Sequence, residues 1–194
     1  MAVNAHAAPV LHIDAGQLMG AMGVAVNGVQ YNVQFQDGTC ASLFSGCDAY
    51  ADFPFQTRHD AVAASQALLA GVFIDTAQGQ FASNPALTNG CGDAQFCQVF
   101  TPYPFTPEGF LSFAIALNFD AASQMPDAIE VLVTNRPFGD TTDITGYTYA
   151  VWSLVSASEV PEPSTVWLVG AMLLLAAGRR AGKNIWIDIK SPLN

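Results

Sequence analysis

Lysine is absent from the first 182 residues of this chain, and basic side chains of any kind are scarce there. Between residues 8 and 163 only Arg58 and Arg136 stand against fifteen aspartates and glutamates, a formal charge of −13, whereas residues 164–194 carry +3. A surface that binds nucleic acid needs clustered lysine and arginine to neutralise phosphates. The composition therefore argues against nucleic-acid binding.

Charged residues of both signs make up only 11% of the chain, and 51% of the residues are hydrophobic. Such a chain has enough apolar side chains to bury a core, which excludes a protein that is disordered throughout. The 194 residues suit one globular domain with peripheral segments.

The short motifs of familiar active sites are missing as well. The sequence contains no GxSxG, no phosphate-binding P-loop, no GxGxxG and no HExxH. Its three histidines, His6, His12 and His59, have no neighbouring nucleophile to activate. We therefore expect a protein that is not an enzyme. The alternative is a hydrolase acting on a matrix polymer, which would require two carboxylates facing each other about 5–10 Å apart.

Four cysteines form two local pairs, in "GTCASLFSGCD" and "GCGDAQFCQV". Neither spacing is that of a CxxC metal knuckle, and no histidine lies beside them. Two disulfides that each close a small loop are the favoured interpretation, and four separately buried thiols are the alternative. Disulfides imply an oxidising compartment. The candidates are Cys40, Cys47, Cys91 and Cys97.

Two segments carry clear local signals of secondary structure. In "MGVAVNGVQYNVQFQDG" alternating apolar residues flank Asn27-Gly28, a pair that readily adopts the positive φ angles of a type I′ turn, which predicts a β-hairpin. "PFQTRHDAVAASQALLAGVFID" predicts a helix that is capped by Thr57 and has Asp60 in its first turn. The apolar stripe of this helix consists of Val62, Leu69, Val72 and Phe73, with alanines between them.

Three further segments, "GFLSFAIALNF", "AIEVLVTN" and "YTYAVWSLV", are rich in β-branched and aromatic residues and predict strands. Segments containing proline and glycine separate them, including "FTPYPFTPEG". The predicted fold class is α+β, a mainly antiparallel β-sheet with one principal amphipathic helix packed on it.

Two features could bind a ligand. Asp140 and Asp143, in "GDTTDITG", offer the oxygen ligands that calcium prefers, although an ordinary solvated turn explains the same residues. The aromatic residues of "VFTPYPF" could stack on sugar rings or serve as packing residues. These features support a carbohydrate- or calcium-binding module as an alternative function.

The first ten residues, "MAVNAHAAPV", match a signal-peptidase site in part, because Ala5 and Ala7 fit its small-residue pattern. The positively charged start and the apolar stretch of a signal peptide are missing. We interpret residues 1–7 as the remnant of a signal peptide that has lost its greater part, with a chance match as the alternative.

Near the other end, "EVPEPSTVWLVGAMLLLAAGRR" contains thirteen uninterrupted apolar residues, Val166 to Gly178. At about 1.5 Å per residue they reach roughly 20 Å, less than the bilayer core of about 30 Å. Arg179 and Arg180 can extend to the headgroups and supply the positive-inside signal. We expect a single transmembrane helix over residues 165–178, and a buried core helix is the alternative.

The order of these C-terminal features resembles the PEP-CTERM sorting signal of exported proteins from Gram-negative bacteria that make exopolysaccharide. The resemblance implies recognition and removal of the segment by an exosortase, a membrane-embedded cysteine protease. The body, from "GQLMGAMGVAVNG" through "AVAASQALL" to "VFTPY", also resembles a recurring group of PEP-CTERM proteins of unassigned function. The residues of the sorting motif are Val160, Pro161, Glu162, Pro163 and Ser164.

Family tails end shortly after the arginines, whereas this chain continues with "AGKNIWIDIKSPLN". A frameshifted end and a genuine extension would both produce such a tail. The expected order is therefore the leader remnant 1–7, an exported domain 8–158, the sorting signal 159–180 and an atypical tail 181–194.

The leading functional hypothesis is an exported, non-enzymatic protein of the cell surface or extracellular matrix. It would cross the inner membrane, be anchored there, and be released by the exosortase, with exopolysaccharide as a further partner. Permanent anchoring is the alternative fate. No cofactor is expected apart from calcium.

Overall fold

The computed structural model describes residues 7–104, 111–134 and 140–156. The predicted sorting motif, the two arginines that follow it, the transmembrane helix over 165–178 and the C-terminal tail lie outside these residues. Within the described part of the chain, no helix has the length and apolar character needed to cross a membrane.

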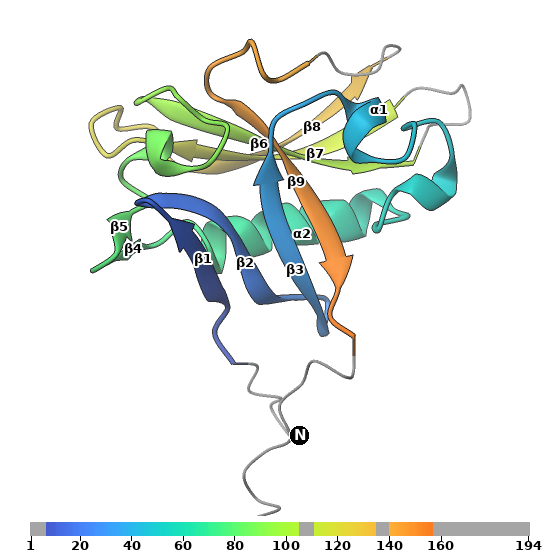
Figure 1. The fold of residues 1–194 in the computed structure, drawn as a ribbon, viewed down its shortest axis with the longest axis horizontal. Helices are drawn as coiled ribbons and strands as arrows, with labels where there is room; N and C mark the ends of the chain where they lie inside the picture. The colour runs from blue at the N-terminus through green and yellow to red at the C-terminus, as the bar shows by residue number, and fades with distance from the viewer. Residues whose placement is uncertain (1–6, 105–110, 135–139, 157–194) are drawn as a thin grey trace, which may run out of the picture. The chain divides into compact units, whose positions relative to one another are not determined.

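Seven strands form one sheet in the order β1-β2-β3-β9-β6-β7-β8 (Figure 1). Every neighbouring pair is antiparallel except β6 and β9, which are parallel. The strands are β1 Val10–Asp14, β2 Gln17–Val26, β3 Val29–Gln36, β6 Phe96–Tyr103, β7 Leu111–Phe119, β8 Ala128–Thr134 and β9 Tyr147–Leu154. The predicted mainly antiparallel sheet is confirmed.

The remaining elements are short, apart from one helix. They are α1 Cys40–Leu43, α2 Arg58–Gly71, the 3-10 turns η1 Tyr50–Asp52 and η2 Pro85–Leu87, and a two-stranded ribbon of β4 Asp75–Thr76 and β5 Gly79–Gln80. One principal helix on a mainly antiparallel sheet is the α+β architecture that the sequence predicts.

The hairpin of β2 and β3 turns at Asn27-Gly28, as predicted. Asn27 has φ of 50° and Gly28 has φ of 82°, the pair of positive angles of a type I′ turn, and Val26 pairs with Val29 across it. The right-handed twist of such a turn matches that of the strands, so the local sequence sets the register here.

Helix α2 begins where the sequence predicts. The backbone N–H of Asp60 donates to the Thr57 hydroxyl at 3.1 Å, which satisfies one of the free N–H groups of the first turn. Oδ1 of Asp60 also accepts a hydrogen bond of 2.8 Å from Nδ2 of Asn27. This contact joins the helix start to the tip of the hairpin.

The buried face of α2 differs in part from the predicted stripe. Ala61, Ala64 and Leu68 are fully buried, whereas Val62 and Leu69 are only half-buried. Alanine has no side chain beyond Cβ, so the helix can approach the sheet closely along the face where its alanines lie. The two predicted residues beyond the helix, Val72 and Phe73, are buried as expected.

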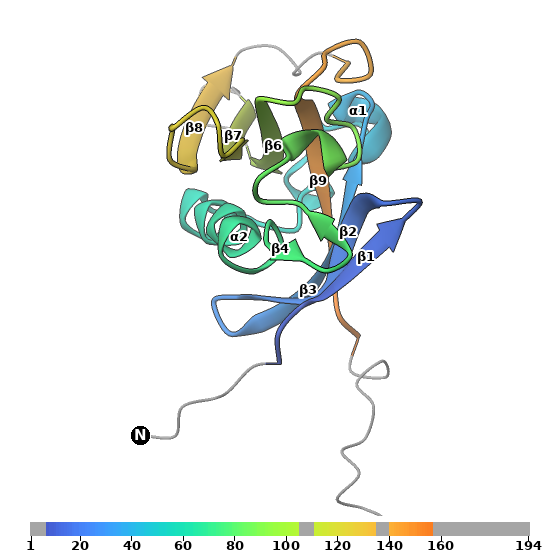
Figure 2. The same ribbon diagram turned by 90° about the vertical axis from the view of Figure 1, so that its left-hand side faces the viewer.

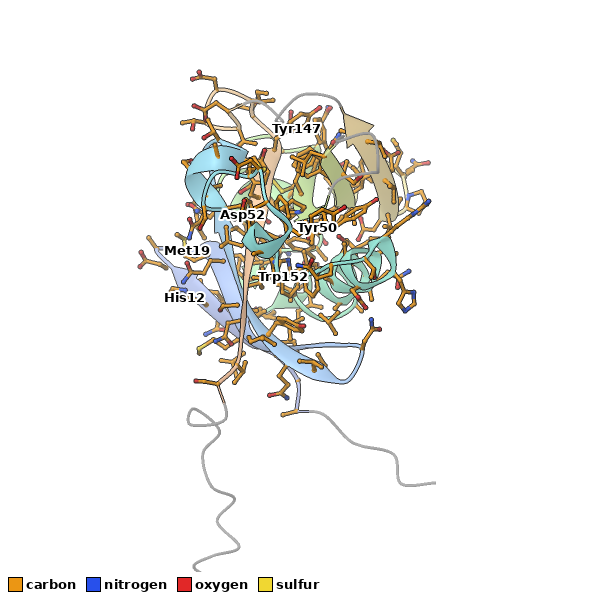
Figure 3. All side chains as sticks on the ribbon, turned by 90° about the vertical axis from the view of Figure 1, so that its right-hand side faces the viewer. His12, Met19, Tyr50, Asp52, Tyr147 and Trp152 are labelled. Carbon is orange, nitrogen blue, oxygen red and sulfur yellow. A yellow bond between two sulfur atoms is a disulfide. The ribbon has the colours of Figure 1, made fainter. Side chains whose placement is uncertain are left out.

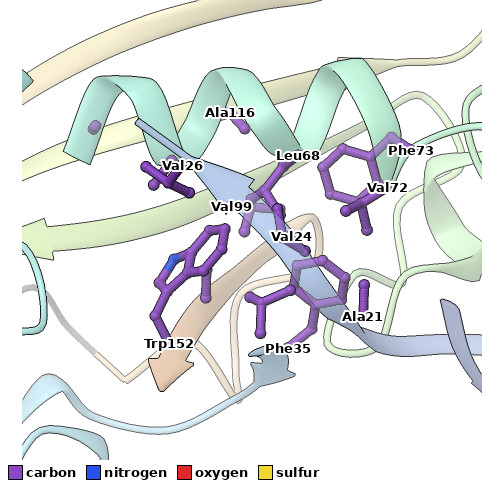
Figure 4. Packing of buried hydrophobic residues seen from close by; sticks show 14 of the residues in the cluster. Ala21, Val24, Val26, Phe35, Leu68, Val72, Phe73, Val99, Ala116 and Trp152 are labelled. Atoms are coloured by element: carbon purple, nitrogen blue, oxygen red, sulfur yellow. The ribbon is translucent and has the colours of Figure 1, made fainter. Parts of the chain in front are cut away.

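The sheet curves around α2. The helix contacts β2 near one edge of the sheet and also β6, β7 and β8 at the other end, and Figure 2 shows it within this curve. The main core fills the space between them (Figure 4), where the rings of Phe35 and Phe73 stack with centroids 5.5 Å apart and Nε1 of Trp152 donates to Oγ1 of Thr101 at 3.2 Å.

A smaller core lies on the other face of β6, β7 and β9, under α1 and η1. Phe44 and Phe53 from this covering segment pack there with Phe100, Phe113 and Tyr149. Strand β7 is therefore buried on both faces, which explains why it is apolar almost throughout.

One segment expected to separate strands is itself part of a strand. Residues 100–103 of "FTPYPFTPEG" belong to β6, and Pro102 pairs with Phe113 of β7. The ladder between β6 and β9 ends at the pair Phe100 and Tyr149, before it reaches Pro102. Proline, which has no N–H to donate, is therefore not required to pair with β9.

Candidate functional site

Both predicted disulfides are present. Cys40 is bonded to Cys47 and Cys91 to Cys97, each pair with a Cα–Cα distance of 5.6 Å, and no cysteine is free. The first disulfide lies in the smaller core and the second in the main core. They indicate an oxidising, extracytoplasmic environment, and the alternative of four reduced thiols is wrong.

Three segments meet where β3 ends and β9 begins. The Thr141 hydroxyl donates to Oδ1 of Asp37 at 3.1 Å and accepts from the backbone N–H of Gly38 at 3.1 Å, while the backbone N–H of Thr141 donates to the Gly38 carbonyl. Nδ2 of Asn89 donates to the Phe35 carbonyl at 2.8 Å. The turns 88–91 and 140–142 are thus both fastened to the end of β3.

Gly90 occupies a position that requires glycine. Its φ is +85°, and the Cys91 N–H donates to the Thr88 carbonyl at 2.9 Å, which closes the tight turn around it. A Cβ at this position would lie 2.5 Å from Oγ1 of Thr148 and 2.6 Å from Oδ1 of Asp37. The absent side chain lets the turn rest directly on two oxygen atoms.

Burial raises the pKa of Asp37 above its usual range, the hydrogen bond from Thr141 opposes this, and the negative charge of Asp140 adds to the rise. No basic group is among the causes. The sequence analysis treated Asp37-Gly38 only as the end of a strand. The sequence also contains a second Asn-Gly pair, Asn89-Gly90, which could have predicted the sharp turn that lies beside Asp37.

The predicted calcium ligands behave differently from each other. Oδ1 of Asp140 accepts hydrogen bonds from the backbone N–H and the hydroxyl of Thr142, at 3.1 and 2.6 Å. These bonds lower the pKa of Asp140, and the bond from the hydroxyl is the larger cause. Asp143 is exposed and makes no hydrogen bond to the described residues. Across residues 7–104, 111–134 and 140–156, no group of three or more His, Cys, Asp or Glu side chains is placed to hold a metal.

The aromatic residues that could stack on sugar rings are core residues where the structure describes them. Phe100 and Tyr103 are only 1% and 7% exposed, so sugar stacking by these two rings is wrong and packing is their role. Phe105 lies outside the described residues. Of the histidines, His12 on β1 and His59 at the start of α2 are exposed, and His6 also lies outside.

A groove of about 490 Å³ runs over the outward face of β1, β2, β3 and β9, opposite the face that packs on α2. None of its lining residues is Lys, Arg, Asp or Glu. Oδ1 of Asn32 accepts from the Gly23 N–H at 3.1 Å, while its Nδ2 makes no hydrogen bond within the described residues. Figure 3 shows His12 on this part of the sheet. The side chains lining the groove include His12, Met22, Asn32, Gln34, Val151 and Ser153.

No family model, no curated protein and no solved structure matches this chain. Proposals about its function therefore depend on its own residues.

Proposed function

We propose that this chain is an exported, non-enzymatic protein of the cell surface or extracellular matrix, with a C-terminal address label that an exosortase-type protease removes. The observation that carries the proposal is the pair of buried, short-loop disulfides. By the chain-entropy estimate, closing loops of this length stabilises the fold by about 2–2.5 kcal/mol each. A reducing compartment would remove that contribution.

The charge distribution supports the same proposal. The acidic body is suited to staying soluble outside the cell, and the basic residues gather beyond Pro163. Prolines at 161 and 163 disfavour a helix just before the apolar run, which leaves an extended peptide for a protease to read.

Intact mass spectrometry tests this proposal. The chain is produced with an export signal in an exopolysaccharide-forming Gram-negative host that has an exosortase, and in the same host without the protease. We expect a product ending near Pro163 only in the first host, with about four mass units separating its reduced and non-reduced forms, two hydrogens per disulfide.

Glu162→Ala in the sorting motif and Glu159→Ala just before it form a matched pair, because each removes one carboxylate. Cleavage should be lost in the first variant and kept in the second. A product that extends to Asn194 in both hosts would reject sorting and leave permanent anchoring or a disabled signal. A cytoplasmic, fully reduced product would reject export itself.

The groove, whose lining includes no Lys, Arg, Asp or Glu, favours a second candidate function, the binding of a neutral polysaccharide. Sugar hydroxyls pair well with amide side chains such as Asn32 and Gln34, and the groove has no carboxylate, ammonium or guanidinium group that would have to lose its hydration. The test is calorimetric titration with neutral dextran and with anionic alginate. Weaker binding is expected for alginate, because the body is acidic.

A double variant, Asn32→Ala with Gln34→Ala, should lose dextran binding. Gln66→Ala with Gln78→Ala makes the comparable change at exposed positions outside the groove and should bind like the unaltered chain. If the two double variants bind equally, the groove is not the site.

A further inference from the structure

A pocket of about 310 Å³ lies where β6 begins and β7 ends. Small-molecule sites in proteins measure about 300–1,000 Å³, so this pocket suits a compact ligand rather than a polymer. Phe96 and Phe119 are paired directly across the two strands, which puts both side chains on one face of the sheet. Both residues line the pocket, together with Asp120, Ser123 and Met125.

The ring of Phe96 is held in place by its neighbours. Its centroid lies 6.3 Å from that of Tyr147, and a Cβ built on Gly146 would be only 2.9 Å from Cε2 of Phe96. The ring therefore rests against the backbone of the turn that precedes β9. Met125 is 55% exposed, and its flexible thioether can adapt to the shape of a ligand.

Of the residues that line the pocket, Asp120 alone carries a formal charge. Its Oδ1 accepts a hydrogen bond of 2.9 Å from the Ser123 N–H, and its own backbone N–H donates to the Gln95 carbonyl at 2.9 Å. Its Oδ2 makes no hydrogen bond to a described residue. Arg58, the one Lys or Arg among the described residues, does not line the pocket. The carboxylate is therefore fixed in position and has no basic side chain beside it in the lining.

This lining restricts the charge and the surface of a ligand. Asp120 would repel an anion, and a neutral apolar ligand would remove water from the carboxylate without replacing its hydrogen bonds. A hard metal ion needs several oxygen ligands, and no group of three or more His, Cys, Asp or Glu side chains in the described chain is placed to hold one. A cation with an apolar surface fits, because aromatic ring faces attract positive charge.

We propose that this pocket binds a small quaternary ammonium ion such as choline, with its methyl groups against Phe96 and Phe119 and with Asp120 as its counter-ion. A quaternary ammonium group carries its charge on methyl groups that contact aromatic rings well, and it has no N–H that needs an acceptor. Ser123 is a positioning residue for Asp120. The same group occurs in free choline and in the headgroup of phosphatidylcholine. The site depends on neither the proposed sorting nor the groove over β1, β2, β3 and β9.

The test titrates the full chain, with both disulfides intact, with choline chloride and follows the backbone amides by NMR. We expect half-saturation near about 1 mM, as suits a small ligand in an open pocket. The amide signals of Gln95, Asp120 and Ser123 should shift. Shifts confined to residues outside the pocket lining would overturn the proposal.

Two analogues of choline separate its charge from its methyl groups. In 3,3-dimethyl-1-butanol a carbon atom replaces the charged nitrogen, and in ethanolamine hydrogens replace the three methyl groups. Each should bind at least about tenfold more weakly than choline. Equal binding of the neutral analogue would exclude a role for the charge, equal binding of ethanolamine would exclude selection of the quaternary group, and either result overturns the proposal.

Asp120→Asn retains an oxygen that can accept from the Ser123 N–H but removes the charge, so choline binding should weaken at least about tenfold. Asp14→Asn removes the same charge from an exposed position on β1 and should bind like the unaltered chain. Phe96→Leu should weaken binding by about threefold or more, whereas Tyr50→Leu, which removes an exposed ring outside the lining, should not. Equal affinities within either pair would overturn the proposal.

Vesicles of phosphatidylcholine distinguish the two sources of the ligand. If free choline displaces the chain from the vesicles and Asp120→Asn lowers the bound fraction, the ligand is the lipid headgroup. If choline binds to the chain but displaces none of it from the vesicles, the ligand is the free compound. A chain that binds neither choline nor these vesicles would overturn the proposal.

Discussion

Replacing Gly90 with alanine tests how closely the turn 88–91 contacts two oxygen atoms, Oγ1 of Thr148 and Oδ1 of Asp37. Two costs are expected. The positive φ of 85° is unfavourable for any residue with a Cβ, by roughly 1–2 kcal/mol. The new methyl group would also meet Oγ1 of Thr148 at 2.5 Å and Oδ1 of Asp37 at 2.6 Å, far inside contact distance.

The second cost is one of overpacking, because Thr148 is buried and β-branched and has little freedom to move away. Inserting a methyl group into a filled site typically costs about 1–3 kcal/mol. The free energy of unfolding should therefore fall by about 2–5 kcal/mol in Gly90→Ala.

Gly28→Ala isolates the backbone cost. Gly28 has nearly the same φ, 82°, and nothing within 4 Å of the position where its Cβ would stand. Urea unfolding of the oxidised protein, followed by circular dichroism, gives both free energies. Gly90→Ala should be the less stable variant by about 1–3 kcal/mol. Equal losses in the two variants would refute the close contact.

Three other outcomes are expected. Replacing Cys91 and Cys97 together by serine should lower the free energy of unfolding by at least about 2 kcal/mol, measured in urea against the oxidised chain; an unchanged midpoint would contradict a stabilising role. Thr57→Ala should cost about 1 kcal/mol by the same assay, because the N–H of Asp60 loses its cap; Thr142→Ala, at an exposed turn, is the comparison and should cost less. The raised pKa of Asp37 means that the folded state holds the carboxyl proton more tightly than the unfolded state does. The stability contributed by the protonated carboxyl is therefore full below pH 3.8 and is lost as pH rises through the raised pKa. The stability difference between Asp37→Asn and the unaltered chain should therefore grow in favour of the variant as pH rises from about 3 to 7, and a difference that stays constant would be evidence against the shift.

Local chemistry was enough to predict several parts of the fold. Asn27-Gly28 specifies its turn almost alone. Thr57 caps the start of its helix by accepting a hydrogen bond from the N–H of Asp60, only three residues away in the sequence. Both disulfides close loops within a single segment, the simplest of the three pairings that four cysteines allow.

What could not be predicted depends on contacts between distant segments. Asp37, Gly90 and Thr148 come together from positions more than fifty residues apart, and no periodic pattern links them. Pro102 lies within a strand because the β6–β9 ladder ends before it, a property of the assembled sheet rather than of the residue. The buried face of α2, with Ala61, Ala64 and Leu68, likewise reflects how the helix fits a curved sheet. The hydrophobicity of the helix alone does not predict which face is buried.

The position of β9 determines when this domain can finish folding. This strand alone joins the β1–β3 half of the sheet to the β6–β8 half, and it is the final strand in the described sequence. A nascent chain that has not yet delivered residues up to Leu154 can form the β1–β3 and β6–β8 pieces, both of which contact α2, but not the seven-stranded sheet. Completion of the sheet would then coincide with the emergence of the segment proposed to be the address label.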